Sequence, residues 1–224
     1  MLSFAEFQVV LLSLQVAFVG TLVALPVGLA AGWLLAKSSM PGKPVLDTLV
    51  SFPLVLPPVV TGYALLLLLG RRGPVGGFLY GVLGIDVVFT WVAAALAVGL
   101  VSLPLIARAI EVSMASVDPR LEGAARSLGS GPWRTFVTVT VPLSYRGILG
   151  GALLGFARAL GEFGATIVVA GNIPGRTQTL PTAIFSRLET GDDTAALRLI
   201  AVSLTLALVS LIVHQRLARR VVRP

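Results

Sequence analysis

The chain has 224 residues, of which 56% are hydrophobic and only 12% are charged. A soluble domain usually carries about 25% charged residues, so this composition indicates a protein whose surroundings are mostly lipid. The formal net charge of +7 would suggest nucleic-acid binding in a soluble protein. In a membrane protein, Lys and Arg gather in cytoplasmic loops instead, and we therefore expect no nucleic-acid partner.

The residue types also exclude most enzyme chemistry. The chain has no Cys and a single His, His214, which rules out disulfides, thiolate metal sites and His clusters. It has no G-x-x-x-x-G-K-[ST] loop for a nucleotide. We expect no metal, no cofactor and no enzyme activity in this chain. Residues 1–32 lack the basic start and the cleavage site of a signal peptide, so the first helix should be retained.

Five stretches, taken in chain order, are long and apolar enough to cross a bilayer as helices. The first contains no charged residue between Glu6 and Lys37. The fold class is therefore an all-α integral membrane protein with a single domain, residues 1–224. The predicted spans cover approximately residues 8–36, 48–70, 87–112, 143–170 and 198–217.

Two predicted spans carry small residues four positions apart, which lets neighbouring helices approach closely. In the first span these residues are Gly20, Ala24, Gly28 and Gly32, and in the fourth they are Gly147, Gly151, Gly155 and Ala159. These stripes predict tight packing between helices and carry no prediction about function.

The second span contains the adjacent prolines Pro57 and Pro58, which remove backbone donors and tend to kink a helix. Carbonyl groups freed at membrane depth must face protein or a water-filled cavity. Pro57, Pro58 and Thr61 are therefore candidates for the lining of a transport pathway. A kink with a purely structural role is an equally good interpretation.

The fourth span carries two charged residues, Arg158 and Glu162, at the i, i+4 spacing that brings side chains together on one helix face. One interpretation is that Arg158 guides an anion through the membrane. The other is a structural ion pair that fixes this helix against its neighbours. We favour the second, because the Glu162 carboxylate would offset the attraction for an anion.

The distribution of Lys and Arg predicts the orientation. Most of them fall in or close to the connector between the first and second spans, the connector between the third and fourth, and the segment after the fifth. Because positive residues are retained on the cytoplasmic side, we expect the amino terminus outside and the carboxyl terminus in the cytoplasm of a cell (inner or plasma) membrane.

The connector at residues 113–142, on the predicted cytoplasmic side, contains a helix of its own. Asp118 is suited to cap it, Pro119 to begin it, and Gly129 to end it in a left-handed conformation. Helical spacing predicts two faces. The apolar face has Leu121, Ala124, Ala125 and Leu128, and the polar face has Arg120, Glu122, Arg126 and Ser127.

This connector resembles the EAA loop of ABC-importer permeases. The matching residues are Glu122, Gly123, Ala124, Ala125, Leu128 and Gly129, followed by Thr138 to Leu143. Gly123 inside the Glu-Ala-Ala core and Val141 in place of a Leu depart mildly from the usual pattern. The resemblance implies a type I ABC-importer bundle, with a coupling helix between the third and fourth spans that sits in a groove of a cytoplasmic ATPase.

A narrower resemblance is to the molybdate and tungstate branch of the oxyanion permeases. It is carried by residues 161–166, Gly-Glu-Phe-Gly-Ala-Thr, by residues 171–177, which include Asn-Ile-Pro-Gly, and by Thr179-Leu180-Pro181. Sulfate permeases share the Gly-Glu-Phe-Gly part and remain an alternative. The resemblance implies a homodimer of this chain in the lipid, a cytoplasmic ABC ATPase dimer, and an external molybdate-binding protein.

Two rivals from other classes are an ATP-independent channel or proton-coupled carrier, and a membrane enzyme. A carrier would need ionisable groups as a relay inside the membrane, for which Arg158 and Glu162 are the only pair. An enzyme would need a His, Cys or carboxylate cluster, and none is evident in the sequence. Copurification of a nucleotide-binding ATPase would favour the importer.

Overall fold

The computed structural model describes residues 2–38 and 40–219, and these form helices and connecting turns without strands. The helices are α1 (Phe4–Lys37), α2 (Lys43–Val55), α3 (Pro58–Leu69), α4 (Pro74–Leu83), α5 (Trp91–Ala115), α6 (Pro119–Ser127), α7 (Pro132–Thr135), the π-helix η1 (Phe136–Thr140), α8 (Val141–Leu160), α9 (Gly164–Val169), α10 (Leu180–Glu189) and α11 (Asp193–Arg219).

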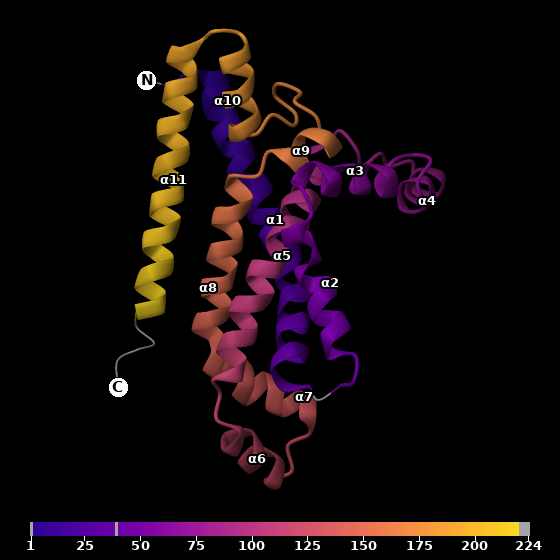
Figure 1. Cartoon of the computed structure of the whole chain (residues 1–224), viewed down its shortest axis with the longest axis vertical. Helices are drawn as coiled ribbons and strands as arrows, with labels where there is room; N and C mark the ends of the chain where they lie inside the picture. Colours follow the sequence, from indigo (N-terminus) through magenta and orange to yellow (C-terminus); the bar gives the residue numbers. More distant parts are fainter. Residues whose placement is uncertain (1, 39, 220–224) are drawn as a thin grey trace.

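Four long segments form the bundle: α1, α5, the continuous segment α7–η1–α8, and α11 (Figure 1). Each is long and apolar enough to cross a bilayer. The bent pair formed by α2 and the segment from α3 to α4 brings the possible number of spans to five. The predicted all-α membrane fold with about five spans is confirmed.

The glycine stripes place α1 and α8 against α5, as the spacing predicts. A Cβ atom at Gly28 of α1 would lie 2.7 Å from Cγ2 of Ile106, and one at Gly155 of α8 would lie 2.6 Å from Cδ1 of the same residue. Both distances are shorter than real Cβ contacts, so a side chain at either position would have to displace Ile106. Ile106 is fully buried between the two helices. The prediction of tight packing is confirmed.

The second predicted span, residues 48–70, is not one straight helix. α2 ends at Val55 and α3 begins at Pro58, and the chain bends by 110° between α2 and the segment that runs from Pro58 to Leu83. Neither Pro57 nor Pro58 has an N–H to continue the ladder, and each disfavours helical backbone in the residue before it. α2 alone is about 20 Å long at 1.5 Å per residue, which is shorter than a hydrocarbon core of about 30 Å.

The fourth predicted span also differs from the structure. Residues 143–170 were expected to form one helix, but the helix starts earlier, at Pro132, and ends at Leu160. The π-helical turn η1 ends two residues before Pro142, whose missing N–H and bulky ring disfavour a regular turn in the preceding residues. Beyond Leu160 the chain breaks at residues 161–163 and then forms the short helix α9.

Candidate functional site

The predicted cytoplasmic helix is present as α6, with the capping that the sequence indicates. The Asp118 carboxylate accepts a hydrogen bond from the N–H of Arg120 at 2.8 Å, and Pro119 is the first helical residue. Gly129 follows the helix with a φ of 85°, a left-handed conformation that favours glycine. The prediction of a short helix between Asp118 and Gly129 is confirmed.

The apolar side of α6 faces outward. Leu128 is 88% exposed, and Leu121 and Ala124 are also exposed. Nearby, Trp133 of α7 and Val137 of η1 are exposed as well. We call these five side chains the α6–α7 surface, and the helices α6 and α7 lie at one end of the bundle (Figure 1). An apolar surface of this kind is suited to binding another protein.

Glu122 behaves differently from the rest of the predicted polar face. Arg120 and Arg126 are exposed, whereas Glu122 is only 8% exposed and points toward the bundle. Its Oε1 accepts a 2.7 Å hydrogen bond from the Thr140 hydroxyl of η1 and lies 3.3 Å from Nζ of Lys37, at the end of α1. Grouping Glu122 with the exposed polar residues is therefore wrong.

Lys37 has a second partner at this junction. Its Nζ donates a 3.1 Å hydrogen bond to the carbonyl of Val117, just before the capping residue of α6. Lys37, Glu122 and Thr140, together with the Val117 carbonyl, are called the Glu122 cluster below. Lys37 and Thr140 were not among the predicted site residues, because their partners are distant in sequence.

Arg158 and Glu162 form the ion pair that their spacing predicts, with 2.8 Å between Arg158 Nη2 and Glu162 Oε2. Glu162 is 2% exposed, and its other oxygen accepts a 2.8 Å hydrogen bond from the N–H of Ala165 in the first turn of α9. The carboxylate therefore joins the end of α8 to the start of α9. Because both oxygens of Glu162 have partners in the protein, the contacts agree with the interpretation of Arg158 and Glu162 as a structural ion pair.

The two breaks in the chain lie against each other. A Cβ atom at Gly164, the first residue of α9, would be 2.9 Å from Cβ of Pro58, and one at Gly62 would be 2.6 Å from the carbonyl oxygen of Ala165. Among the described residues, the buried Thr61 hydroxyl has no hydrogen-bond partner. Pro57 is exposed beside it. The breaks thus concentrate irregular backbone in one region, which is typical of membrane proteins where backbone lines a cavity.

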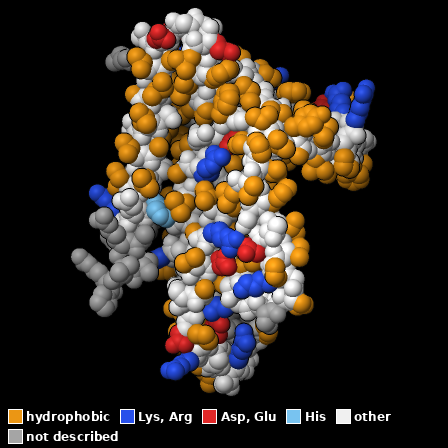
Figure 2. All heavy atoms as spheres, viewed as in Figure 1, with side chains coloured by type: hydrophobic (Ala, Val, Ile, Leu, Met, Phe, Trp, Pro, Cys, Tyr) orange, Lys and Arg blue, Asp and Glu red, His pale blue; other side chains and the backbone are white. Residues whose placement is uncertain are grey.

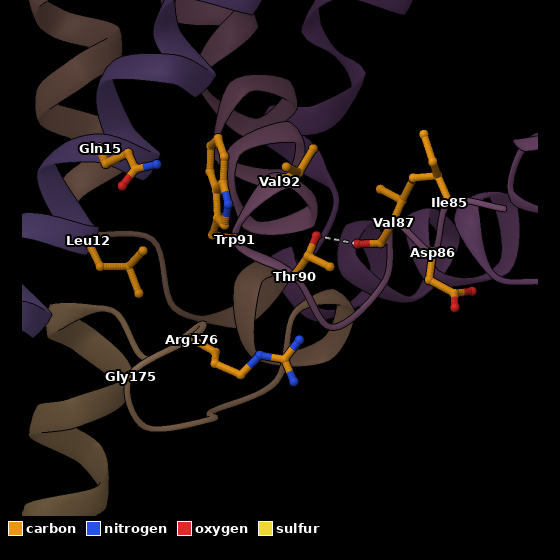
Figure 3. A pocket seen from close by; sticks show the side chains of 10 residues that line it. All are labelled: Leu12, Gln15, Ile85, Asp86, Val87, Thr90, Trp91, Val92, Gly175 and Arg176. Atoms are coloured by element: carbon orange, nitrogen blue, oxygen red, sulfur yellow. Dashed lines mark hydrogen bonds between the residues drawn. The ribbon is translucent and has the colours of Figure 1, made fainter. Parts of the chain in front are cut away.

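A cavity of about 540 Å³ lies between α1, the start of α5 and the loop before α10 (Figure 3). Its polar lining includes Gln15, Asp86, Thr90 and Arg176, and the Arg176 guanidinium lies below Thr90 in the view. An adjacent pocket shares Asp86, Thr90 and Arg176. The sequence alone does not indicate this cavity, since its lining comes from three separated segments.

Asp86 is paired rather than free. Nε and Nη2 of Arg71 donate to its two carboxylate oxygens at 2.7 and 2.6 Å. These hydrogen bonds hold the pKa of Asp86 below its ordinary value, so the carboxylate is charged at neutral pH. Arg176 has no ion-pair partner within the described part of the chain, which leaves one cationic side chain available at the cavity.

Comparison with known proteins identifies the family. The binding-protein-dependent transport system inner membrane components match residues 24–223. The chain belongs to this family. It is 49% identical to the molybdenum transport system permease protein ModB of Escherichia coli K12, over 96% of this chain and 94% of that protein. It is 44% identical to ModB of Haemophilus influenzae, over 96% and 94% of the two chains.

Sulfate permeases are more distant relatives. The sulfate transport system permease protein CysT of Escherichia coli K12 is 35% identical over 97% of this chain and 79% of that protein. Among solved structures, an inward-facing form of the MetNI methionine ABC transporter matches with a TM-score of 0.74 and 18% identity, over 98% of this chain and 97% of that one. At this identity the likeness supports the fold alone. The chain is thus a multi-pass membrane protein of an ABC permease family.

Proposed function

We propose that this chain is the transmembrane permease subunit of an ATP-driven importer for molybdate or tungstate, and that it forms the path by alternating access. The observation that carries the proposal is the 49% identity to a molybdenum permease over nearly the full length of both chains, compared with 35% for a sulfate permease. ATP hydrolysis belongs to a separate ATPase subunit in this proposal.

The partner proposed for the α6–α7 surface is the cytoplasmic ABC ATPase dimer. Leu121, Ala124 and Leu128 are exposed on a helix whose backbone is capped at both ends, so the helix offers an apolar face of fixed shape. Exposed Arg120 and Arg126 border this face. The EAA-loop residues Glu122, Gly123, Ala124, Ala125, Leu128 and Gly129 are proposed to couple ATP hydrolysis to transport through this contact.

A second copy of this chain and an external molybdate-binding protein complete the proposed assembly. α3 and α4 project from the bundle as an arm (Figure 1) and expose apolar side chains such as Tyr63, Leu67 and Phe78. A homodimer would cover part of this arm, and lipid the rest. The binding protein is proposed to dock at the opposite end from α6, beside the cavity that contains Arg176.

The proposed orientation places α6 and the carboxyl terminus in the cytoplasm and the amino terminus outside. Charged side chains gather toward the end of the bundle that carries α6, while hydrophobic side chains cover much of the rest of this face (Figure 2). The chain has no natural cysteine, so single cysteines can test the orientation. Glu189→Cys should react with an impermeant thiol reagent from outside, and Ser127→Cys should not; the reverse pattern would overturn the orientation.

Transport in vesicles that contain the assembled complex tests the function. With ATP inside and the molybdate-loaded binding protein outside, we expect uptake of molybdate and tungstate and a rise in ATP hydrolysis. Sulfate should give neither. Stimulation by sulfate alone would overturn the substrate assignment, and uptake without ATP would favour a channel or a proton-coupled carrier.

Two variants of α6 test the coupling role. Ala125→Trp introduces bulk into the proposed contact, and Gly129→Val forces a β-branched residue into a left-handed conformation, which costs on the order of 1–2 kcal/mol. Both should reduce ATPase binding and uptake while the chain still inserts. Ala201→Trp, at an exposed position of α11, is the matched control. Normal uptake and normal ATPase binding in both α6 variants would overturn the coupling role.

A further inference from the structure

α6 must be held to the transmembrane helices if it is to move them, a premise that rests on the proposed function. The four hydrophobic clusters formed by the described residues contain no side chain of α6. The apolar side chains of this helix face outward instead. Within the described structure, α6 is therefore not fixed by a hydrophobic core, and other contacts must set its position.

The Glu122 cluster supplies contacts of this kind. Glu122 lies in the segment proposed to bind the ATPase, yet its side chain points away from the exposed apolar face and toward Lys37 and Thr140. Thr140 is 2% exposed, and the side chains of Lys37 and Glu122 are also largely buried. Burying a carboxylate is unfavourable unless it is paired and hydrogen-bonded. Both conditions are met at Glu122, so its inward direction is stabilised by specific partners.

Lys37 contacts α6 and also the chain just before it. Its ammonium group binds the Glu122 carboxylate inside the helix and the Val117 carbonyl immediately before the helix. Two contacts on one group fix both the position and the direction of α6, whereas apolar contacts are non-directional. Lys37 is also the last residue of α1, where a positive charge is favourable at the helix C-terminus.

The same junction connects to the long helices. Lys37 ends α1, which packs along α5, and Thr140 ends η1, which continues directly into α8. Trp33 of α1 packs on Phe136 of η1, with 5.2 Å between ring centroids. A displacement of α6 would therefore act on α1 and α8 through one carboxylate.

We propose that Lys37 is a positioning residue for energy coupling: with the Thr140 hydroxyl, it holds Glu122 inward and so fixes α6 to the ends of α1 and η1. Lys37 does not contact the transported anion or ATP in this proposal. Its loss should leave the ATPase-facing surface of α6 intact. What should fail is the transfer of movement from α6 to the membrane-spanning helices.

The test uses the assembled complex in vesicles and measures molybdate uptake, ATP hydrolysis and their ratio. Lys37→Met keeps the aliphatic part of the side chain and removes the ammonium group. Because hydrogen bonds to charged groups are strong, we expect uptake per ATP to fall by about tenfold, while the ATPase stays bound and active. Lys37→Arg should restore most of the ratio. Lys43→Met removes the only other lysine and should change little.

A second pair of variants keeps the proposal testable if Lys37→Met assembles poorly. Thr140→Val removes one hydrogen bond at nearly constant volume and should lower uptake per ATP by a smaller factor, and Thr140→Ser should restore it. A wild-type ratio in Lys37→Met, or in Thr140→Val where Lys37→Met does not assemble, overturns the inference. The proposed function itself fails separately, if the wild-type complex shows no ATP-dependent uptake of molybdate or tungstate.

Discussion

Two buried glutamates in this chain make similar contacts, but their partners lie at different distances along the sequence. Glu162 has its partners within four residues: the guanidinium of Arg158 and the N–H of Ala165. Glu122 has partners in two other helices, the ammonium group of Lys37 and the hydroxyl of Thr140. Each carboxylate is paired with one cation and accepts a further hydrogen bond, so the difference lies in what each one connects.

The range of these contacts determines their consequence. Glu162 fixes a local change of direction, since it lies in the break between α8 and α9 and bonds to the first turn of α9. Glu122 fixes a relation between separate elements, since α6 meets α1 and η1 through it. The first contact is therefore expected to matter mainly for folding, and the second mainly for the movement of one part relative to another.

The largest expected effect is that of Glu162→Ala on stability. The substitution leaves the Arg158 guanidinium without its partner and removes the cap from α9. The Glu162 side chain is 2% exposed and that of Arg158 is 33% exposed, so the substitution breaks a half-buried ion pair and a hydrogen bond to a charged group, at a cost of about 3 kcal/mol. We expect a clear fall in the unfolding temperature of the purified protein in detergent and a lower yield. Glu162→Gln retains an acceptor for the Ala165 N–H and should lose less, whereas wild-type stability in Glu162→Ala would show that the local contact is dispensable.

A smaller effect is expected at the place where the two chain breaks touch. At Gly62, the Cβ of an alanine would meet the Ala165 carbonyl at 2.6 Å, so Gly62→Ala must push α3 away from α9. Overpacking of this kind costs about 1–3 kcal/mol. Gly81 of α4 has open space around it, and Gly81→Ala is the matched control, which should keep or slightly raise the unfolding temperature. Equal unfolding temperatures for the two variants would contradict the packing of α3 on α9.

The local features of this fold could be predicted from the sequence, and the long-range ones could not. The spacing of Arg158 and Glu162 indicates their ion pair, and Asp118, Pro119 and Gly129 indicate the ends of α6, because these contacts depend on neighbouring residues. The inward direction of Glu122 depends on Lys37, which is far away in the sequence. Helical periodicity groups Glu122 with Arg120 and Arg126 because it contains no information about what lies beneath the helix.

The breaks after α2 and after α8 also involve contacts between residues that the sequence pattern does not connect. The prolines at positions 57 and 58 predict a kink, but they predict neither the bend of 110° nor the close approach of α3 to α9. The end of α8 at Leu160 was missed, because an apolar stretch of 28 residues with an i, i+4 pair reads as one helix. Glu162 forms that pair and also caps the next helix, and only the structure reveals the second contact.

The smallest expected effect is that of Asp86→Asn. This variant tests whether a carboxylate stabilises the fold because it is buried or because it is paired. Asp86 has two hydrogen bonds from Arg71, as good in geometry as the contacts of Glu162, but both side chains are exposed to the surroundings at the cavity. Exposed ion pairs contribute little, because water already solvates both charges. Unfolding temperature at pH 7 and uptake should both stay close to the wild-type values.

The contribution of the Asp86–Arg71 pair to stability should change with pH in one direction only. Hydrogen bonds from Arg71 lower the pKa of Asp86 below its ordinary 3.8, so any contribution of the pair is complete above that value and is lost as the pH falls through the lowered pKa. Unfolding of the wild type and of Asp86→Asn should therefore differ little between pH 7 and pH 5. A fall in stability at pH 7 as large as that of Glu162→Ala would mean that pairing alone, and not burial, makes a carboxylate important in this fold.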